Sequence, residues 1–278
     1  LYADLVSAGC VTELTGSPGG LHLGITLGYP CASQIDALRE RIERQVVPHL
    51  QGLALNLDLS VAVKPHRTQN DMPAMEQVAN IIAVASGKGG VGKSTTAVNL
   101  ALALSAEGAR VGLLDADIFG PSQPLMLGLP DGTRPEVLEG DRFVPVPAHG
   151  LQTMSMGFLM TRQTPVVWRG PKASGALTQM MIQTLWRDLD YLIVDLPPGT
   201  SEIQLTLAQK IPVAGAVVVT TPQDAILARR RHAAHDPAVI GVDRHVQAEF
   251  KCAQFRRVLR YQVGGGDAGP PAHDPAFP

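Results

Sequence analysis

A glycine-rich run at residues 87–95, G-K-G-G-V-G-K-S-T, limits the possible folds of this chain more than any other part of its sequence. It fits the pattern G-x-x-x-x-G-K-[ST]. The apolar run 80–86 before it predicts a short buried strand, and the run 93–107 after it predicts a helix that stops at Gly108. The strand, glycine turn and helix favour an α/β fold with a mostly parallel central sheet.

The same run has the composition of a loop that holds nucleotide phosphates. Glycines allow successive backbone N–H groups to point inward, because no Cβ restricts the backbone angles. We expect Lys93 to reach the β- and γ-phosphates and the Ser94 hydroxyl to ligate Mg²⁺. A chance match of a glycine-rich turn is the alternative, and the flanking strand and helix argue against it. The predicted nucleotide-binding residues of the loop are Gly87, Lys88, Gly89, Gly90, Val91, Gly92, Lys93, Ser94 and Thr95.

Two further apolar runs end in carboxylates. The run 110–114 precedes Asp115 and Asp117, and a later run ends in Asp195. Ligands of open parallel sheets gather at the carboxyl ends of the strands. We expect Asp117 to orient the attacking water or to contact Mg²⁺ through water, supported by Asp115, although an ordinary solvated turn would also explain this pair. Asp195 is expected to hold Mg²⁺ through a water molecule next to Ser94.

The segment that follows Asp195 is typical of a switch loop. Gly199 can offer its N–H to a γ-phosphate and lose that contact after hydrolysis. Residues 214–221 then predict a further buried strand.

Taken together, four strings resemble one family. They are G-K-G-G-V-G-K-S-T at 87–95, L-L-D-A-D-I-F-G-P-S at 113–122, W-R-G-P at 168–171 and D-L-P-P-G-T-S at 195–201. The combination is similar to the Mrp/ApbC group of P-loop ATPases, which are related to MinD, ParA and the nitrogenase iron protein. The resemblance covers roughly residues 79–230. For W-R-G-P alone, a packed aromatic at a helix start explains Trp168 equally well.

The resemblance implies a function. It predicts an ATPase with a deviant Walker A loop that hydrolyses ATP slowly with Mg²⁺ and carries iron–sulfur clusters to apo-proteins. It also predicts a homodimer that sandwiches the nucleotide, in which Lys88 reaches the partner's nucleotide. Lys88, Lys93 and Asp117 are therefore the expected catalytic residues. The alternatives are a positioning ATPase of the MinD/ParA type and a defective fragment that has lost cluster binding.

Residues 1–65 predict a separate small α/β domain, followed by a polar linker at 66–78. Apolar residues recur at helical spacing over 33–50, and residues 53–63 alternate strictly as in a half-buried strand. Residues 21–27 are a second strand candidate. This region resembles the iron–sulfur-assembly domain often fused ahead of Mrp-type ATPases, through D-L-V-S-A-G near the start and L-G-Y-P-C-A-S before the helix.

Cys31 is a candidate cluster ligand or transfer thiol. It precedes a predicted helix N-terminus, where the dipole can lower the pKa of a thiol, and a half-buried structural cysteine is the alternative. Ser33 and Asp36 fit an N-cap pair for that helix. Cys252 is the second candidate thiol, and Cys10 is expected to be structural.

The last part of the chain departs from the family pattern after Arg229. No C-x-x-C pair accompanies Cys252, so stable binding of an iron–sulfur cluster, which commonly needs four thiolates, is doubtful in this chain. Residues 231–278 are predicted to be a divergent, poorly ordered tail. A frameshifted product and a genuine divergence both remain open, and the chain opens on Leu1, so the true start is expected upstream.

Composition narrows the expected partners. The 278 residues carry a formal net charge of −2, which gives no global signal for nucleic acid or membrane. The sequence contains no apolar run of about 18 residues and no visible signal peptide. Three cysteines suggest no disulfide framework, so a cytoplasmic protein is expected.

Overall fold

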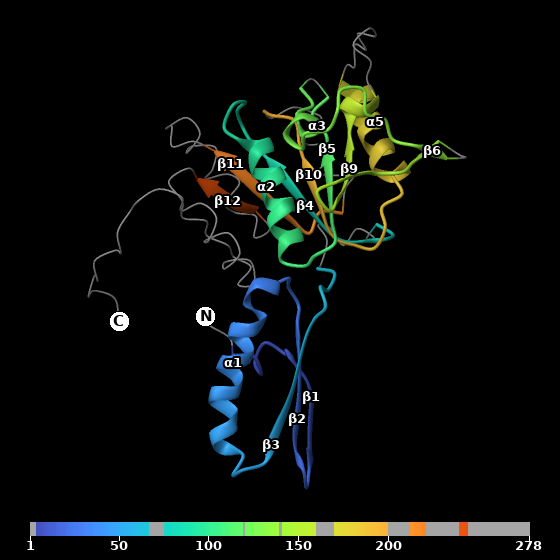
Figure 1. Ribbon diagram of the computed structural model, residues 1–278. Coiled ribbons are helices and arrows are strands. Elements are labelled where there is room, and N and C mark those ends of the chain that lie inside the picture. Colours follow the sequence, from blue (N-terminus) through green and yellow to red (C-terminus); the bar gives the residue numbers. More distant parts are fainter. Residues whose placement is uncertain are drawn as a thin grey trace, which may run out of the picture.

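The computed structural model describes residues 4–66, 75–118, 120–138, 141–159, 170–199, 212–220 and 239–243. It contains a small unit with a three-stranded sheet and a large unit with a seven-stranded sheet (Figure 1). The fold is α/β with a mostly parallel central sheet, as the sequence predicts. Within the described ranges, no helix is both long enough and apolar enough to cross a membrane.

The small unit packs one helix against its sheet. Its elements, in chain order, are β1 (Val11–Ser17), β2 (Gly20–Leu27), α1 (Ile35–Val46) and β3 (Ala54–Val61). β1 pairs antiparallel with β2, and β2 pairs parallel with β3. The helix predicted over 33–50 and the strands predicted over 53–63 and 21–27 are confirmed, with 3₁₀ turns at Ala32–Gln34 and Val47–His49 flanking α1.

The apolar periodicities of the small unit meet in a single core. Ile42 from α1, Leu57 from β3 and Ile25 from β2 are buried together there. The two cysteines Cys10 and Cys31 belong to the same cluster. The helical and alternating patterns therefore point their apolar residues at each other, because each element buries only one side.

The large sheet has the strand order β12-β11-β4-β10-β5-β9-β8. Neighbouring strands are parallel, apart from the antiparallel pair β8–β9. These strands are β4 (Val78–Ala85), β5 (Val111–Asp115), β8 (Val146–Ala148), β9 (Leu151–Ser155), β10 (Leu189–Asp195), β11 (Gly215–Thr220) and β12 (Val239–Asp243). A two-stranded ribbon, β6 (Val137–Leu138) with β7 (Arg142–Phe143), precedes β8.

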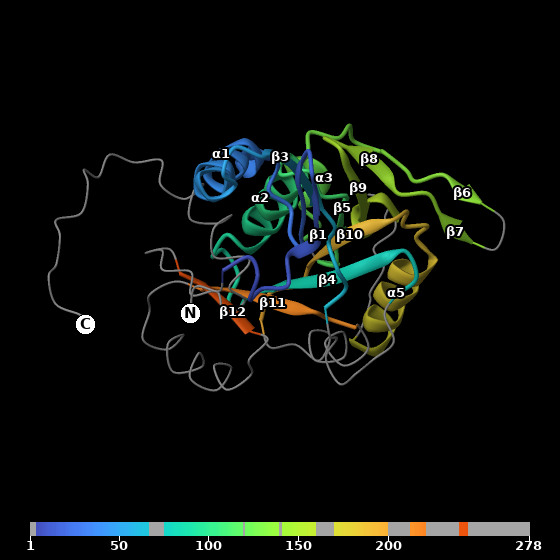
Figure 2. The same cartoon turned by 90° about the horizontal axis from the view of Figure 1, so that it is seen from below.

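Helices cover both faces of the large sheet, which explains why its central strands are nearly continuous apolar runs. Helix α2 (Lys93–Ala106) lies on one face, where its Leu104 shares a buried cluster with Val84 and Ile193. Helix α5 (Gly170–Gln183) lies on the other (Figure 2). The short helices α3 (Gln123–Met126) and α4 (Met156–Leu159) follow β5 and β9.

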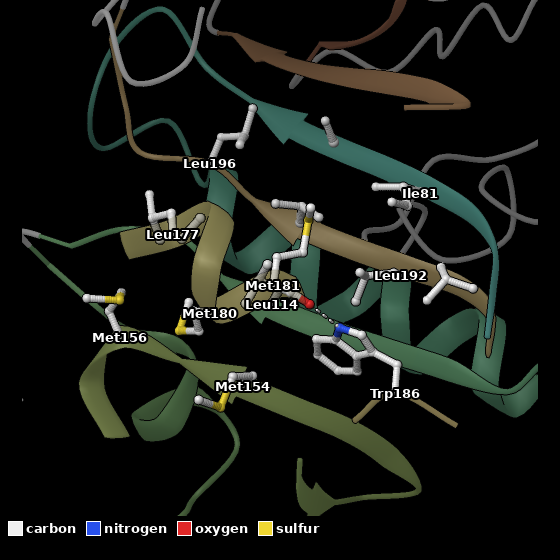
Figure 3. Packing of buried hydrophobic residues seen from close by; sticks show 14 of the residues in the cluster. Ile81, Leu114, Met154, Met156, Leu177, Met180, Met181, Trp186, Leu192 and Leu196 are labelled. Atoms are coloured by element: carbon white, nitrogen blue, oxygen red, sulfur yellow. Dashed lines mark hydrogen bonds between the residues drawn. The ribbon is translucent and has the colours of Figure 1, made fainter. Parts of the chain in front are cut away.

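On the α5 face, methionines and large apolar side chains fill the layer between helix and sheet (Figure 3). Met180 and Met181 of α5 share this buried cluster with Ile81 and Leu192 of the sheet. The indole N–H of Trp186 donates to the carbonyl oxygen of Met181 at 3.1 Å, so the large aromatic is buried without an unpaired polar atom.

A buried asparagine attaches the start of the predicted linker to the large sheet. Asn80 in β4 is 2% exposed. Its Oδ1 accepts from the His66 backbone N–H at 2.8 Å, and its Nδ2 donates to the carbonyl oxygens of Lys64 and Asp190 at 3.1 and 3.2 Å. Residues 67–74 lie outside the described ranges.

The edge strand β12 lies beyond the predicted end of the P-loop domain at residue 230. It pairs parallel with β11, so five residues of the predicted tail extend the sheet. Trp168 and Arg169 of the W-R-G-P string, and the segment 244–278 with Cys252, are outside the described residues.

Candidate functional site

The carboxyl ends of β4, β10 and β5 lie side by side at one edge of the large sheet. β10 runs between the other two strands, and Asp195 is in register with Asp115 and with Val84. Both carboxylates are 0% exposed. The parallel register therefore brings together two acidic residues that are eighty positions apart, at the edge from which the glycine-rich loop leaves.

The loop has the backbone conformation that its glycines predict. Gly90 and Gly92 have φ values of 75° and 88°, in the left-handed region that favours glycine, and Gly92 is the N-cap of α2. Cβ atoms built on Gly87, Gly89, Gly90 and Gly92 would meet no atom within 4 Å. The glycine positions therefore border open space, as a cradle for a ligand requires.

Lys93 lies at the centre of the site. Its side chain is 6% exposed, and Nζ forms an ion pair with Asp195 Oδ1 and donates to Ser94 Oγ at 3.2 Å. The two oxygens expected to hold Mg²⁺ thus converge on one cation, the lysine ammonium group. Their hydroxyl and carboxylate chemistry suits Mg²⁺, so the residues present fit that ion.

Gln123, the first residue of α3, also belongs to this site. Its Nε2 donates to Asp195 Oδ2 at 2.8 Å and to the carbonyl oxygen of Ser94 at 3.0 Å. No sequence motif predicted a role for this residue. The only signal was its place in the P-S-Q-P segment shortly after Asp115 and Asp117, and a glutamine carries no motif by itself.

Asp115 is an anchor for the loops around it rather than only a support for Asp117. Its Oδ2 accepts from the backbone N–H groups of Ser122 and Gln123 at 3.0 and 3.1 Å, and from Ser155 Oγ at 3.1 Å. Burial, together with the neighbouring charge of Asp195, raises the pKa of the Asp115 carboxyl to about 7.

Asp117 and Gly199 lie on the loops that follow β5 and β10. The Asp117 N–H donates to Asp115 Oδ1 at 3.1 Å, and Asp117 Oδ1 accepts from the Gly120 N–H at 3.2 Å. Gly199 has a φ of 97°, and its N–H donates to the Ser86 carbonyl oxygen at 2.9 Å. Contact between this N–H and a phosphate would require that hydrogen bond to open.

Cys31 lies at the opposite end of α2 from Lys93. The Ala32 N–H donates to the Glu107 carbonyl oxygen at 3.1 Å, just after the last turn of α2. At 1.5 Å per residue, the fourteen residues from Lys93 to Glu107 separate the two ends by about 20 Å. The structure therefore groups Lys93 and Ser94 with Asp195, and leaves Cys31 apart from them.

Two local predictions around Cys31 are wrong. Burial, and then the charge of Glu107, raise the pKa of the Cys31 thiol, whereas the sequence predicts a lowered value. The N-cap pair is absent, because neither Cys31 nor Gln34, the N-caps of the 3₁₀ turn and of α1, makes a side-chain capping bond. The Ser33 hydroxyl donates to Glu107 instead.

The two cysteines in the described part of the chain are buried and do not belong to a group of potential metal ligands. Cys10 and Cys31 are 7% and 5% exposed, which agrees with the structural role expected for Cys10. The described ranges contain no group of three or more His, Cys, Asp or Glu residues that could hold a metal ion.

A glycine loop between a strand and a helix, with a buried lysine paired to the carboxylate at the end of a neighbouring parallel strand, defines a P-loop nucleotide-binding protein. The chain belongs to the NUBPL iron-transfer P-loop NTPase family, whose model matches residues 77–237. A second model, for an iron–sulfur cluster assembly protein, matches residues 2–54. The predicted family resemblance is confirmed.

Curated relatives have names that agree with this family. The chain is 58% identical over 185 residues to an iron–sulfur cluster carrier protein from Pseudomonas fragi, covering 66% of this chain and 64% of the relative. It is 53% identical over 207 residues to one from Salmonella typhimurium, covering 74% of this chain and 56% of the relative. The chain therefore spans less than two thirds of the length of these relatives.

Among solved structures, a nucleotide-binding protein from Archaeoglobus fulgidus in complex with ADP is 36% identical. The match covers 57% of this chain and 62% of that chain, with a TM-score of 0.48.

Proposed function

We propose that this chain binds and slowly hydrolyses ATP, as part of a carrier that assembles or transfers iron–sulfur clusters to apo-proteins. The observation that supports it most is the buried contact of Lys93 with Asp195 and Ser94 beside the glycine loop. Membership of an iron-transfer NTPase family and the names of the relatives support the cargo.

Each loop residue then has a role in the proposed site. Backbone N–H groups of residues 87–95 bind the phosphates, and Lys93 exchanges its ion pair with Asp195 for the β- and γ-phosphates. Ser94 and Asp195 would hold Mg²⁺, which neutralises phosphate charge when it is bound. Asp117 orients the attacking water, and Gly199 leaves Ser86 to contact the γ-phosphate.

The active form is proposed to be a homodimer with the nucleotide between two copies. Lys88 is exposed in the loop, where it could reach a nucleotide held by a second copy. The test is Lys88→Ala, which should lower ATP hydrolysis and ATP-induced dimerisation while nucleotide binding to the single chain persists. Hydrolysis equal to that of the wild type would contradict the dimeric arrangement.

Lys93→Ala tests the site itself. It should abolish Mg²⁺-dependent ATP hydrolysis, measured as phosphate release, and weaken binding of a fluorescent ADP at least about tenfold, since one phosphate-binding charge is lost. Lys64→Ala, at an exposed lysine, is the matched control. Unchanged hydrolysis in Lys93→Ala would refute the site assignment.

Nucleotide binding and cluster binding are separable in this chain. Its three cysteines, Cys10, Cys31 and Cys252, form no C-x-x-C pair, and the first two are buried. Anaerobic reconstitution with iron and sulfide, followed by visible absorbance, should therefore give little or no chromophore. The lack of a C-x-x-C pair among these cysteines favours the second candidate, a P-loop ATPase that has lost its cargo site. A stable chromophore that disappears in Cys252→Ala would reject that candidate.

A further inference from the structure

The side-chain amide of Gln123 connects two elements of the nucleotide site that are far apart in the sequence. Nε2 donates to Asp195 Oδ2 at the end of β10 and to the Ser94 carbonyl oxygen in the first turn of α2. The backbone N–H of the same residue donates to Asp115 Oδ2 at the end of β5. One residue therefore links the phosphate-loop helix to both acidic strand ends.

The amide has one permitted orientation. Both of its contacts at Nε2 are acceptors, the Ser94 carbonyl oxygen and the Asp195 carboxylate. Turning the amide over would place Oε1 against two oxygens, so the network itself identifies the nitrogen. Gln123 is 2% exposed, and water therefore does not compete for these two hydrogen bonds.

The two oxygens of the Asp195 carboxylate have different partners. Oδ2 is held by Gln123, while Oδ1 pairs with the Lys93 ammonium group, to which Ser94 Oγ is also bonded. A carboxylate held at Oδ2 cannot rotate without losing that bond. Oδ1 and Ser94 Oγ are thus kept on the same cation.

A purely structural role explains this glutamine poorly. Its Oε1 is buried and accepts no hydrogen bond from the residues that the structure describes. A buried acceptor without a partner is unfavourable, and an apolar side chain would fill the position without that penalty. What glutamine adds is the pair of donors at Nε2.

We propose that Gln123 is a positioning residue of the magnesium–nucleotide site. By fixing Asp195 Oδ2 and the Ser94 backbone, Gln123 keeps Asp195 Oδ1 and Ser94 Oγ directed at the same cation. The inference rests on the proposed function, because it presumes that the loop binds a magnesium nucleotide.

The test compares nucleotide affinity with Mg²⁺ and with EDTA, using a fluorescent ADP. Gln123→Leu removes both donors, and Gln123→Glu replaces Nε2 by an oxygen that faces Asp195. We expect the Mg²⁺-dependent gain in affinity to fall about tenfold in Gln123→Leu, the effect of one hydrogen bond to a charged group, and further in Gln123→Glu. Affinity in EDTA should change by less than about twofold. Electron paramagnetic resonance of Mn²⁺ should show the same loss of metal from the protein–nucleotide complex.

Gln152→Leu is the matched control, because it also removes a side-chain amide that bridges backbone groups. Gln152 Nε2 donates to the Arg187 carbonyl oxygen at 2.8 Å, and its Oε1 accepts from the Arg187 N–H at 2.9 Å. It should lower the melting temperature without changing the Mg²⁺ dependence. A Mg²⁺ dependence in Gln123→Leu equal to that of the wild type would overturn the proposal.

Two further outcomes bear on both proposals at once. A wild-type protein that binds no nucleotide would refute the proposed function and this inference together, whereas a change confined to the Gln123 variants supports both. Gln123→Met, an unbranched apolar replacement, serves if Gln123→Leu does not fold. Failure of both apolar variants to fold, beside a folded Gln152→Leu, would assign Gln123 to structure alone and overturn the inference.

Discussion

Ser33 is bound twice to the Glu107 carboxylate, across 74 positions of the sequence. The Ser33 hydroxyl donates to Oε1 at 2.6 Å, and its backbone N–H donates to Oε2 at 2.9 Å. Ser33 follows Cys31 in the small unit, and Glu107 follows the last turn of α2. The helix that begins at Lys93 thus has the phosphate loop at one end and the small unit at the other.

Loss of Glu107 should make Cys31 more reactive. Burial and, after it, the charge of Glu107 raise the pKa of the Cys31 thiol. Glu107→Gln removes the second of these causes, and Glu107→Ala also removes both acceptors for Ser33. Because the thiolate is the nucleophile, alkylation of Cys31 by iodoacetamide at pH 7.5 should be several-fold faster in Glu107→Gln and faster still in Glu107→Ala.

Mass spectrometry of the peptides would separate Cys31 from Cys10, which serves as an internal reference in the same core. Glu40→Ala, at an exposed position of α1, is the control for a general effect of losing an acidic residue. Equal alkylation rates in wild type and Glu107→Ala would show that the contact does not govern the thiol.

Asn80→Ala should destabilise the protein. The change removes all three hydrogen bonds that the buried Asn80 side chain makes, to backbone groups of His66, Lys64 and Asp190. We expect the free energy of unfolding in urea to fall by about 2–4 kcal/mol. Asn99→Ala, on the exposed side of α2, should cost less than about 0.5 kcal/mol. Similar losses in the two variants would mean that the Asn80 contacts add nothing to stability.

The raised pKa of Asp115 predicts how stability depends on pH. Burial and the charge of Asp195 raise the pKa of this carboxyl from its ordinary value of 3.8 to about 7, so between these values the native state holds a proton that the unfolded state releases. The contribution of this residue to the free energy of unfolding should therefore fall as pH rises from about 4 to 7, by roughly 2–4 kcal/mol, and then level off.

Urea unfolding of the nucleotide-free protein at several pH values, in EDTA, measures this slope. Asp115→Asn should flatten the difference between pH 5 and pH 7.5, whereas Asp141→Asn, at an exposed position, should leave it unchanged. A wild-type protein whose slope matches that of Asp115→Asn would show that Asp115 is already ionised at pH 5.

Much of the fold could be predicted because its signals are local. The alternating leucines of β3, the apolar run of β4 and the glycine that ends α2 each follow from backbone periodicity or backbone angles. β1 was not predicted, because only Val11 at its start is partly buried and the rest of the strand is exposed. An exposed edge strand carries no apolar pattern to recognise.

The residues of the candidate site likewise differ in whether a local sequence signal predicts them. Asp195 could be expected beside the loop, because carboxyl ends of parallel strands meet at one edge. Gln123 could not, since its role depends on two acceptors that lie 29 and 72 positions away. Although Gln123 directly follows the string at 113–122, its partners become identifiable only once the chain is packed.

Local sequence patterns are enough to predict the phosphate loop, the strand–loop–helix unit and the acidic strand ends, because these depend on glycine backbone freedom and on short-range periodicity. Which groups are buried together depends instead on how the whole chain packs. Packing α2 on the sheet, with its C-terminal end against the small unit, places Glu107 beside Ser33, two residues after Cys31. Burial and the charge of Glu107 together reverse the shift in thiol pKa expected from the helix dipole. Solvent exclusion and long-range contacts set these properties, and neither can be obtained from the local order of residues.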